Sequence, residues 1–265
     1  MSDPAPAASA STSTAPAASA SAYGEAFADV YDDWYSDVSD IGATVARIVA
    51  VNPSQNILEL GVGTGRLAIP LANADRRVVG IDASPAMLAR LETKIQSTRL
   101  QPILADMAQF DLEESFDIAF VAFNTIFNLE SSSAQQSCFS SVSNHLKPGG
   151  LFFVEAIVPD LDPPAGDRGI TTRHLADGGL VLNATINSST KQMMTGQQIH
   201  ITPDGRIKLR PWQIHYRTPG QLDVLAVAAG LTLLERHEDW AHTPFTDTSA
   251  RHVSVYTKPT TERPL

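Results

Sequence analysis

A glycine-rich turn carries the clearest chemical signal in the sequence. It reads ELGVGTG over residues 59–65, directly after a short apolar segment and directly before a helical pattern. Glycines at such a turn let the chain bend tightly and let a ligand approach main-chain N–H groups at the positive end of the helix. Asp82 closes the next apolar segment, where a carboxylate can accept both hydroxyls of a ribose. These features predict a ribose-containing ligand.

The neighbours of the turn select among such ligands. The NAD fingerprint requires a small residue at the last position of G-x-G-x-x-G, where this chain has Arg66. Glu59 lies two residues before Gly61, and a carboxylate there repels a pyrophosphate and attracts an ammonium group. The pattern therefore favours a cationic nucleoside over a dinucleotide, and it argues against a nicotinamide dehydrogenase.

Glu155 is the candidate catalytic residue. It interrupts the apolar run LFFVEAIV over residues 151–158, at the carboxyl end of a predicted strand, which is the edge where open α/β sheets bind ligands. A general base is needed to deprotonate a phenol, an alcohol or an indole, whereas a neutral amine needs none. Two alternatives stay open for Glu155: contact with a substrate ammonium, and a structural pair with Arg168 or Arg173.

Metal chemistry is not predicted. The tract ERHEDWAH over residues 235–242 contains acids and histidines, but on an extended strand His237 and its neighbour Glu238 point to opposite faces. The histidines also lack the H-x-x-x-H spacing of a helical metal site. Cys138 is the sole cysteine, so neither an internal disulfide nor a thiolate cluster can form.

An alternation of strands and helices must position these residues. Apolar, β-branched segments separated by helical patterns predict a parallel sheet with helices on both faces. The predicted strands are NILEL (56–60), RRVVGID (76–82), PILAD (102–106), FDIAFVAF (116–123), LFFVEAIV (151–158), LTLLERHEDW (231–240) and RHVSVYTK (251–258). One of the last two is expected to be antiparallel. Helices are expected after the glycine turn, from Ser84 to Ile95, from about Ser132 to Leu146, and from Thr218 to Gly230.

Between Pro159 and Arg217 the helical period disappears. Three strands are predicted there: GLVLNATINSS (179–189), KQMMTGQQIHIT (191–202) and RIKLRPWQIHYR (206–217). The turn signature Pro203-Asp204-Gly205 joins the last two. This region, residues 160–217, is therefore an antiparallel meander inserted into the α/β frame.

The N-terminal region divides by composition. Of residues 1–22, 20 are Ala, Ser, Thr or Pro, which predicts a disordered tail. Residues 23–53 are expected to form a helical lid, with Phe27, Tyr31, Trp34 and Tyr35 on one face of its first helix. A second helix over residues 41–51 is expected to end at Asn52-Pro53. The acids of the first helix are interpreted as a solvated face, with attraction of cationic amines as the alternative.

Composition narrows the class of protein. The chain has 265 residues, with 29 acidic against 19 basic side chains and a net charge of -10, which opposes binding to nucleic acid. No apolar run reaches the length of a membrane span, and the N-terminus lacks the features of a signal peptide. We expect a cytoplasmic protein whose residues 23–265 form a single domain.

In this order, the motifs ILELGVGTG, VVGIDASPAML, ILADMAQFDL, FDIAFVAFNTIFNL and HLKPGGLFFVEA resemble class I S-adenosylmethionine-dependent methyltransferases. The resemblance covers about residues 23–258. More narrowly, ADVYDDWY, FNTIFNL, the meander and HVSVY are similar to bacterial small-molecule methyltransferases of specialised metabolism. It implies a Rossmann-like, doubly wound, seven-stranded and mostly parallel sheet with an N-terminal helical lid and a β-insertion over the substrate side.

The resemblance also implies roles for matching residues. The methionine moiety would contact Glu59, Gly61, Gly63 and Gly65; the ribose would contact Asp82; and the adenine would contact Ala83, Met87, Asp106 and Met107. Phe123, Asn124 and Phe127 would lie near the sulfonium and the substrate entrance, and Tyr31, Trp34 and Tyr35 would close over cofactor and substrate. His174 and His215 are further substrate candidates. The competing interpretations are structural: Glu59 as a surface acid at a strand end, Met87 as helix core, Asp106 as a loop cap, Asn124 as bonded to its own turn, and the lid aromatics as a packed helix face.

The implied reaction is methyl transfer from S-adenosylmethionine to a small molecule in natural-product biosynthesis. The acceptor is expected to be an amine or an electron-rich aromatic such as a phenol or an indole. Two alternatives stay open: a protein side chain as acceptor, and a binding protein that holds the cofactor without turnover. The oligomeric state also stays open, a homodimer included.

Overall fold

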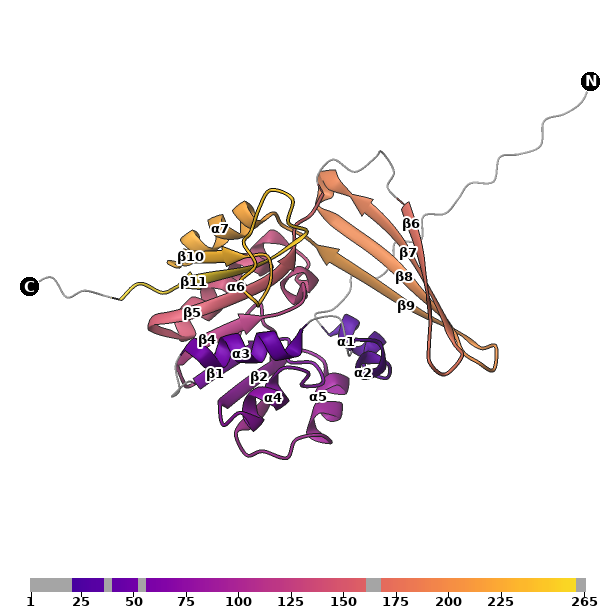
Figure 1. Ribbon diagram of the computed structural model, residues 1–265, viewed down its shortest axis with the longest axis horizontal. Coiled ribbons are helices and arrows are strands. Elements are labelled where there is room, and N and C mark those ends of the chain that lie inside the picture. The colour runs from indigo at the N-terminus through magenta and orange to yellow at the C-terminus, as the bar shows by residue number, and fades with distance from the viewer. Residues whose placement is uncertain (1–20, 36–39, 52–55, 161–167, 261–265) are drawn as a thin grey trace, which may run out of the picture.

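The computed structural model describes residues 21–35, 40–51, 56–160 and 168–260. Its larger sheet has seven strands in the order β10-β11-β5-β4-β1-β2-β3 (Figure 1). The strands are β1 (Asn56–Leu60), β2 (Arg77–Asp82), β3 (Leu100–Leu104), β4 (Phe116–Val121), β5 (Leu146–Ile157), β10 (Thr232–His237) and β11 (Arg251–Thr257). Strands β1 to β5 are parallel, and β11 is antiparallel to both of its neighbours. The predicted mostly parallel, seven-stranded sheet is confirmed.

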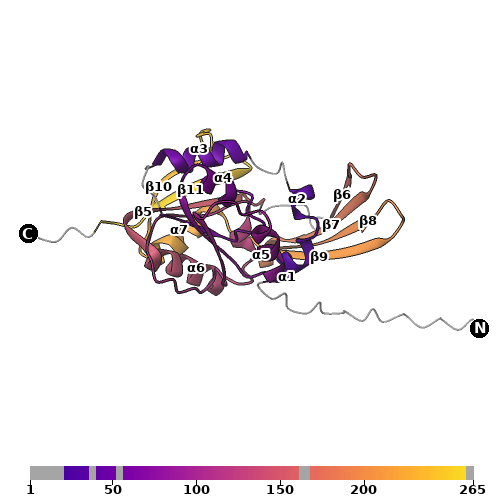
Figure 2. The ribbon, with the colours of Figure 1, turned by 90° about the horizontal axis from the view of Figure 1, so that it is seen from below.

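Helices cover both faces of this sheet. They are α3 (Ile41–Val51), α4 (Ala68–Asn73), α5 (Pro85–Glu92), α6 (Ser132–His145) and α7 (Pro219–Ala228). Ile48, Leu71 and Leu91, from α3, α4 and α5, belong to one core cluster, whereas Phe139 and Leu222, from α6 and α7, belong to another. Figure 2 shows α3 and α6 on opposite sides of the sheet. The central strands β1, β2 and β4 are buried on both faces for this reason, which explains their nearly continuous apolar sequences.

Side-chain caps begin the helices where the sequence predicts them. Ser84 accepts a hydrogen bond from Met87 N at the start of α5, and Pro85 is its first helical residue. Thr218 and Gln221 form both halves of a capping box at the start of α7. The chain leaves α7 through Gly230, whose φ is +77°.

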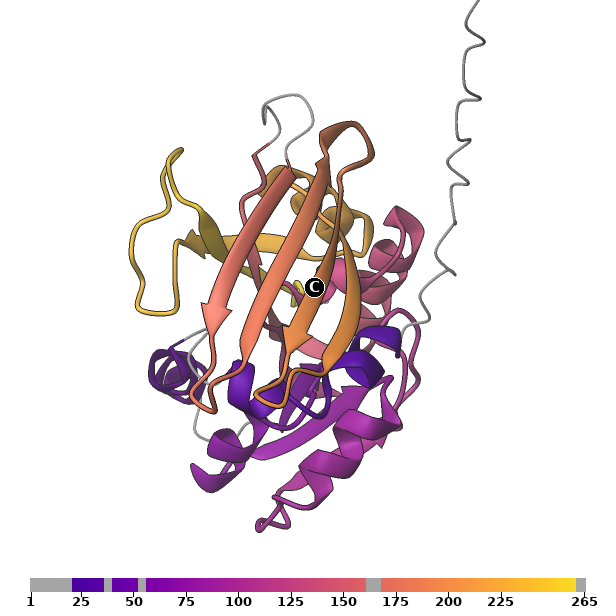
Figure 3. The same ribbon diagram turned by 90° about the vertical axis from the view of Figure 1, so that its right-hand side faces the viewer.

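A second, antiparallel sheet projects from the body (Figures 1 and 3). Its strands, in spatial order, are β6 (Arg168–His174), β7 (Leu180–Ser188), β8 (Met193–Ile201) and β9 (Ile207–His215). Three of them match the predicted meander. Strand β6 is not predicted by the sequence, because RGITTRH is a polar edge strand with most of its residues exposed and lacks the alternation of a half-buried strand. Residues 161–167 of the insertion lie outside the described part.

The lid differs from its prediction. The single helix expected from Tyr23 is wrong: the chain forms α1 (Ala22–Phe27) and α2 (Tyr31–Trp34), separated at Val30, whose φ of −123° and ψ of −3° are not helical. Both helices then bury an aromatic ring in one cluster, Phe27 with 0% and Trp34 with 2% of its surface exposed. Residues 1–20 of the expected tail, and Asn52-Pro53, lie outside the described residues.

Among the described helices, none has the length and apolar character that crossing a membrane requires.

Candidate active site

The three glycines of the turn after β1 have different surroundings. All have positive φ, which favours glycine. A Cβ on Gly65 would lie 2.4 Å from Leu91 Cδ1, so Gly65 permits close packing against α5. A Cβ on Gly63 would meet nothing nearer than Tyr31 Cε1 at 4.0 Å. Gly63 therefore leaves its backbone open to a ligand, whereas Gly65 serves the packing behind it.

Asp82 lies at the carboxyl end of β2 and faces the same turn. Its Oδ2 accepts a hydrogen bond from Gly63 N at 2.8 Å, and its Oδ1 accepts one from Ser84 N at 2.9 Å. Burial raises the pKa of this carboxyl, although these backbone donors oppose the change. A carboxylate has about four lone-pair sites, so capacity remains for two further donors.

A cavity of about 70 Å³ opens between the carboxyl ends of the strands and the lid. Its lining is Tyr23, Gly24, Tyr31, Gly61, Gly63, Ile81, Asp82, Ala83, Met87, Ala105, Asp106, Met107, Thr125, Asn128 and Leu129. Every residue predicted to bind the cofactor is in this set except Glu59, Gly65 and Phe123. The topology thus brings together residues from the carboxyl ends of four strands, β1 to β4, and from the lid.

Glu59, the fourth residue of β1, is not among the residues that line this cavity. It is 4% exposed, and its Oε2 is buried without a hydrogen-bond partner. Burial raises its pKa to about 8, although the nearby Arg66 lowers it. A buried carboxylate oxygen without a partner is costly, and a cationic ligand would supply the missing donor.

The loop after β4 is attached to β5 by three hydrogen bonds. Phe123 and Asn124 have φ of 48° and 64°, which is strained for residues with a side chain. Glu155 Oε2 accepts from Phe123 N at 2.9 Å, and Glu155 O accepts from Asn124 N at 3.1 Å. Asn124 Oδ1 in turn accepts from Ile157 N at 2.7 Å. Among the described ion pairs, Glu155 has neither Arg168 nor Arg173 as a partner.

Comparison with known proteins agrees with this geometry. The methyltransferase-domain family matches residues 57–150. The CcbJ methyltransferase from Streptomyces caelestis is 34% identical, with a TM-score of 0.84 over 91% of this chain and 99% of that chain. The protein is a class I S-adenosylmethionine-dependent methyltransferase. It is of the bacterial specialised-metabolism type, and its cofactor is S-adenosylmethionine.

Two further relatives extend the comparison. The cypemycin N-terminal methyltransferase from Streptomyces sp. is 28% identical over 240 residues, which cover 88% of this chain and 96% of that protein. The amino pentose methyltransferase CalS10 from Micromonospora echinaspora, solved with S-adenosylmethionine bound, has a TM-score of 0.67 at 22% identity over 86% of this chain and 96% of that chain. This similarity shows that the methyltransferase and CalS10 have the same fold.

Acids of the lid fasten it to the cofactor side of the methyltransferase. Glu25 on α1 accepts a hydrogen bond from Ser84 Oγ at 2.8 Å, beside the ribose candidate. Asp32 on α2 pairs with Lys94 at 2.9 Å and accepts from Thr64 Oγ1, within the glycine turn, at 2.5 Å. The interpretation of the lid acids as a solvated face is wrong for Glu25 and Asp32, because each of these two has a partner on the body.

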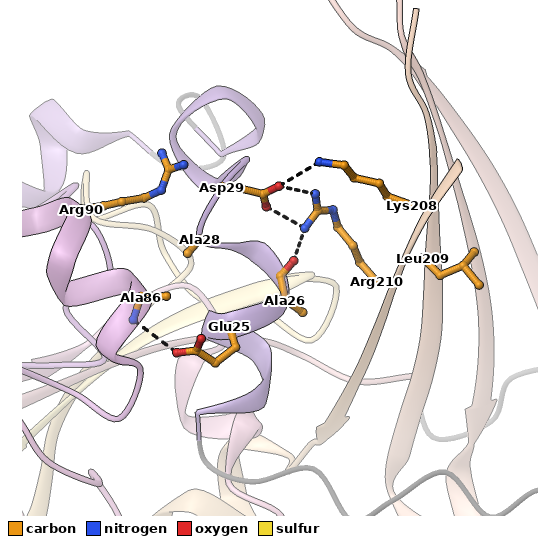
Figure 4. Close-up of a pocket in the computed structure, with 9 residues that line it drawn as sticks. All are labelled: Glu25, Ala26, Ala28, Asp29, Ala86, Arg90, Lys208, Leu209 and Arg210. Atoms are coloured by element: carbon orange, nitrogen blue, oxygen red, sulfur yellow. Dashed lines mark hydrogen bonds and ion pairs between the residues drawn. The ribbon is translucent and has the colours of Figure 1, made fainter. Parts of the chain in front are cut away.

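Asp29 fastens the lid to the smaller sheet. It pairs with Arg210 on β9 at 2.7 Å and with Lys208 at 3.4 Å, and Arg210 also donates to Ala26 O (Figure 4). A groove of about 610 Å³ lies beside these contacts, lined by Glu25, Ala26, Ala28, Asp29, Ala86, Arg90, Lys208, Leu209 and Arg210. It shares no residue with the cavity that holds the glycine turn.

The predicted substrate residues are not gathered in one place. Trp34 is buried, with Arg173 and Arg210 over its ring at 5.3 and 5.5 Å, so it anchors the smaller sheet. Phe127 is fully buried in the core. Tyr35 stacks on Tyr31 with ring centroids 4.9 Å apart.

The two predicted substrate histidines lie at opposite ends of the smaller sheet. His174 is exposed and pairs with Leu180. His215 pairs with Met193, and its carbonyl accepts a hydrogen bond from Gln135.

Several residues that line the cavity were not predicted from the sequence. Tyr23 belongs to the aromatic N-terminal segment, and Thr125 and Asn128 lie in FNTIFNL, so these motifs contained the signal. No sequence motif indicated Gly24 as a cavity residue. The structure shows that a Cβ at Gly24 would lie 2.3 Å from Ser84 Cβ.

We predict that Glu59 makes the cofactor-free methyltransferase less stable as pH rises. The pKa is about 8 in the fold against 4.5 for an ordinary glutamate, so the folded state retains a proton that the unfolded chain releases. Its stabilising contribution is complete below pH 4.5 and is lost as pH rises through about 8. Chemical denaturation across this pH range measures the free energy of unfolding. This free energy should fall with pH more steeply in wild type than in Glu59→Gln, by at most about 1.4 kcal/mol per pH unit. Equal slopes would contradict the buried, unpartnered carboxyl.

Proposed function

We propose that the methyltransferase methylates an amine nitrogen of a small molecule in natural-product biosynthesis. The observation that carries this proposal is the hydrogen bond from Phe123 N to Glu155 Oε2. This hydrogen bond gives the carboxylate at the edge of the sheet a structural task, holding the loop after β4, that accounts for its position without proton abstraction. An amine attacks through its own lone pair once it is neutral, so it needs no such base.

The polar groups in and beside the cavity match those that S-adenosylmethionine requires, and the lid must move to admit it, because about 70 Å³ is less than the roughly 300 Å³ of a small ligand pocket. We assign the methionine ammonium to the unpartnered oxygen of Glu59, the ribose hydroxyls to Asp82, and the backbone approach to Gly63. Ala83, Met87, Asp106 and Met107 line the same cavity and are assigned to the adenine. The cofactor supplies a methyl group already activated on a sulfonium, so the protein contributes alignment and exclusion of water.

The lid and the smaller sheet are assigned to the acceptor. Tyr31 lines the cofactor cavity and stacks on Tyr35, whose hydroxyl accepts from Gln198 on β8 at 3.4 Å. On the neighbouring strands Trp212 Nε1 donates to Asn183 Oδ1 at 3.0 Å. These side chains offer neutral polar contacts and aromatic surface, which suit a small polar molecule better than a strongly charged one.

The 28% identical relative named cypemycin N-terminal methyltransferase supports an amine acceptor. The name of that relative refers to an N-terminus, so a peptide α-amine is the second candidate acceptor. The two candidates differ in the length of substrate that must pass the lid.

The test is a panel of matched acceptors incubated with enzyme and S-adenosylmethionine, with product masses measured. Primary and secondary amines should be methylated, whereas their phenol and indole counterparts should not, and the rate should fall as pH drops below the pKa of the acceptor amine. Short peptides with free and acetylated N-termini identify a peptide acceptor. Methylation of phenols or indoles but not of amines would overturn the proposal.

A further inference from the structure

Three potential metal ligands meet beside the end of β10. Glu235, His237 and His242 each offer a ligand atom, and these atoms lie within 4.8 Å of one another. Glu235 Oε2 is 3.2 Å from His237 Nε2, and the two imidazole rings are 4.7 Å apart. In a tetrahedral zinc site, metal–ligand bonds of 2.0–2.2 Å place neighbouring ligand atoms about 3.3 Å apart. A small movement of the exposed His242 side chain would complete that geometry.

The turn that follows β10 brings these residues together. The expectation of an extended strand through Trp240 is wrong, because β10 ends at His237. Glu238 N then donates to Thr243 O at 2.8 Å, and Asp239 accepts two backbone hydrogen bonds inside the turn. His242 has φ of 68°. The chain thus folds back and returns His242 to His237, a proximity that spacing along an extended strand does not reveal.

Oriented ligand atoms point to an ion at this position. His237 Nε2 and Glu235 Oε2 face each other at 3.2 Å, so these are the two atoms that an ion would bridge. Arg47 on α3 binds Glu235 Oε1 at 2.6 Å, which fixes the carboxylate and leaves its Oε2 toward the histidines. Hydrogen bonds that orient a ligating carboxylate are typical of metal sites. Glu235 and His237 are two residues apart on a strand, so they share one face.

We propose that Glu235, His237 and His242 bind one zinc-type divalent cation, with water in the fourth position. Two imidazoles and one carboxylate form a known zinc ligand set, and imidazole suits zinc, copper and nickel. His237 pairs with Val253, which pairs with Glu155, so the site lies at the carboxyl edge of the sheet, two strands from Glu155. The ion would attach the turn to β10 and, through Glu235, to α3.

The test uses the untagged full-length protein, stripped of metal with a chelator and titrated with zinc chloride in a calorimeter. One zinc should bind per chain. His237→Ala and His242→Ala should each weaken zinc binding by more than about 100-fold, because loss of a partner that only orients a ligand already costs about 10–100-fold. His174→Ala removes an exposed histidine elsewhere, so it is the matched control and should bind zinc as wild type does.

Thermal unfolding supplies a second measurement. Zinc should raise the midpoint of wild type and of His174→Ala but not of His242→Ala, whose exposed position makes it tolerant of substitution. Absence of one-to-one binding up to about 100 μM zinc, a value far weaker than structural sites achieve, would overturn the proposal. Binding that both cluster variants retain would also overturn it.

Discussion

Replacing Asp82 with alanine is expected to weaken S-adenosylmethionine binding by about 100-fold or more. Two hydrogen bonds from ribose hydroxyls to a charged acceptor contribute roughly 1.5–3 kcal/mol each, and alanine removes both. The variant also loses the acceptors for Gly63 N and Ser84 N, so the glycine turn becomes less ordered. Calorimetric titration with S-adenosylmethionine measures the loss directly.

Two further variants control this experiment. Asp82→Asn keeps one carbonyl oxygen and the size of the side chain, so it should fold and show an intermediate loss. Asp247→Ala removes an exposed aspartate in the segment before β11 and should leave cofactor affinity unchanged. Wild-type affinity in both Asp82 variants would contradict the ribose assignment.

Replacing Glu155 separates positioning from proton abstraction. As a positioning residue it holds the Phe123 amide, and a glutamine oxygen can accept the same hydrogen bond. We therefore expect Glu155→Gln to keep most of the activity and the wild-type pH profile. Glu155→Ala should release the strained pair Phe123-Asn124, and misplacement by about 1 Å costs on the order of 100-fold in kcat.

The outcomes for Glu155 are clearly distinguishable. A general base contributes about 100- to 10,000-fold, so a comparable loss in Glu155→Gln, with loss of the acidic limb of the pH profile, would establish the base role. Asn124→Gly is the companion variant. It permits the same positive φ but removes the hydrogen bond from Ile157 N, and it should lower kcat while circular dichroism shows an intact fold.

The frame of the methyltransferase was predictable because its signals are local. Strands such as NILEL and RRVVGID are buried on both faces, so they are apolar along their length and stand out from the helices between them. The cap at Ser84 and the capping box at Thr218 act within four residues of sequence, which is why the starts of α5 and α7 were found. Asp82 and the glycine turn were named from their places at strand ends, which meet at one edge of a parallel sheet, whereas Ala83, Met87, Asp106 and Met107 were named from the family resemblance; all of these residues except Gly65 line the cavity.

The features that could not be predicted depend on contacts between residues that are far apart in the sequence. Nothing in the sequence around Glu25 or Asp29 indicates Ser84 or Arg210 as a partner, so their acidity was interpreted as solvation. The bend at Val30 serves burial of aromatic rings against the body, and helical periodicity alone continues through it. Glu155 was recognised as exceptional from its apolar surroundings, but its bond to Phe123 N depends on how β4 and β5 lie side by side.

The placement of α1 has a consequence for the order of events in a catalytic cycle. The helix holds Ser84, next to the ribose candidate, through Glu25, and it holds Arg210, on the sheet assigned to the acceptor, through the carbonyl of Ala26, with Asp29 in the following turn as a second partner of Arg210. A displacement of α1 as a rigid unit breaks both sets of bonds together. We therefore expect release of spent cofactor to be coupled to loosening of the smaller sheet over the acceptor, because both depend on the position of α1.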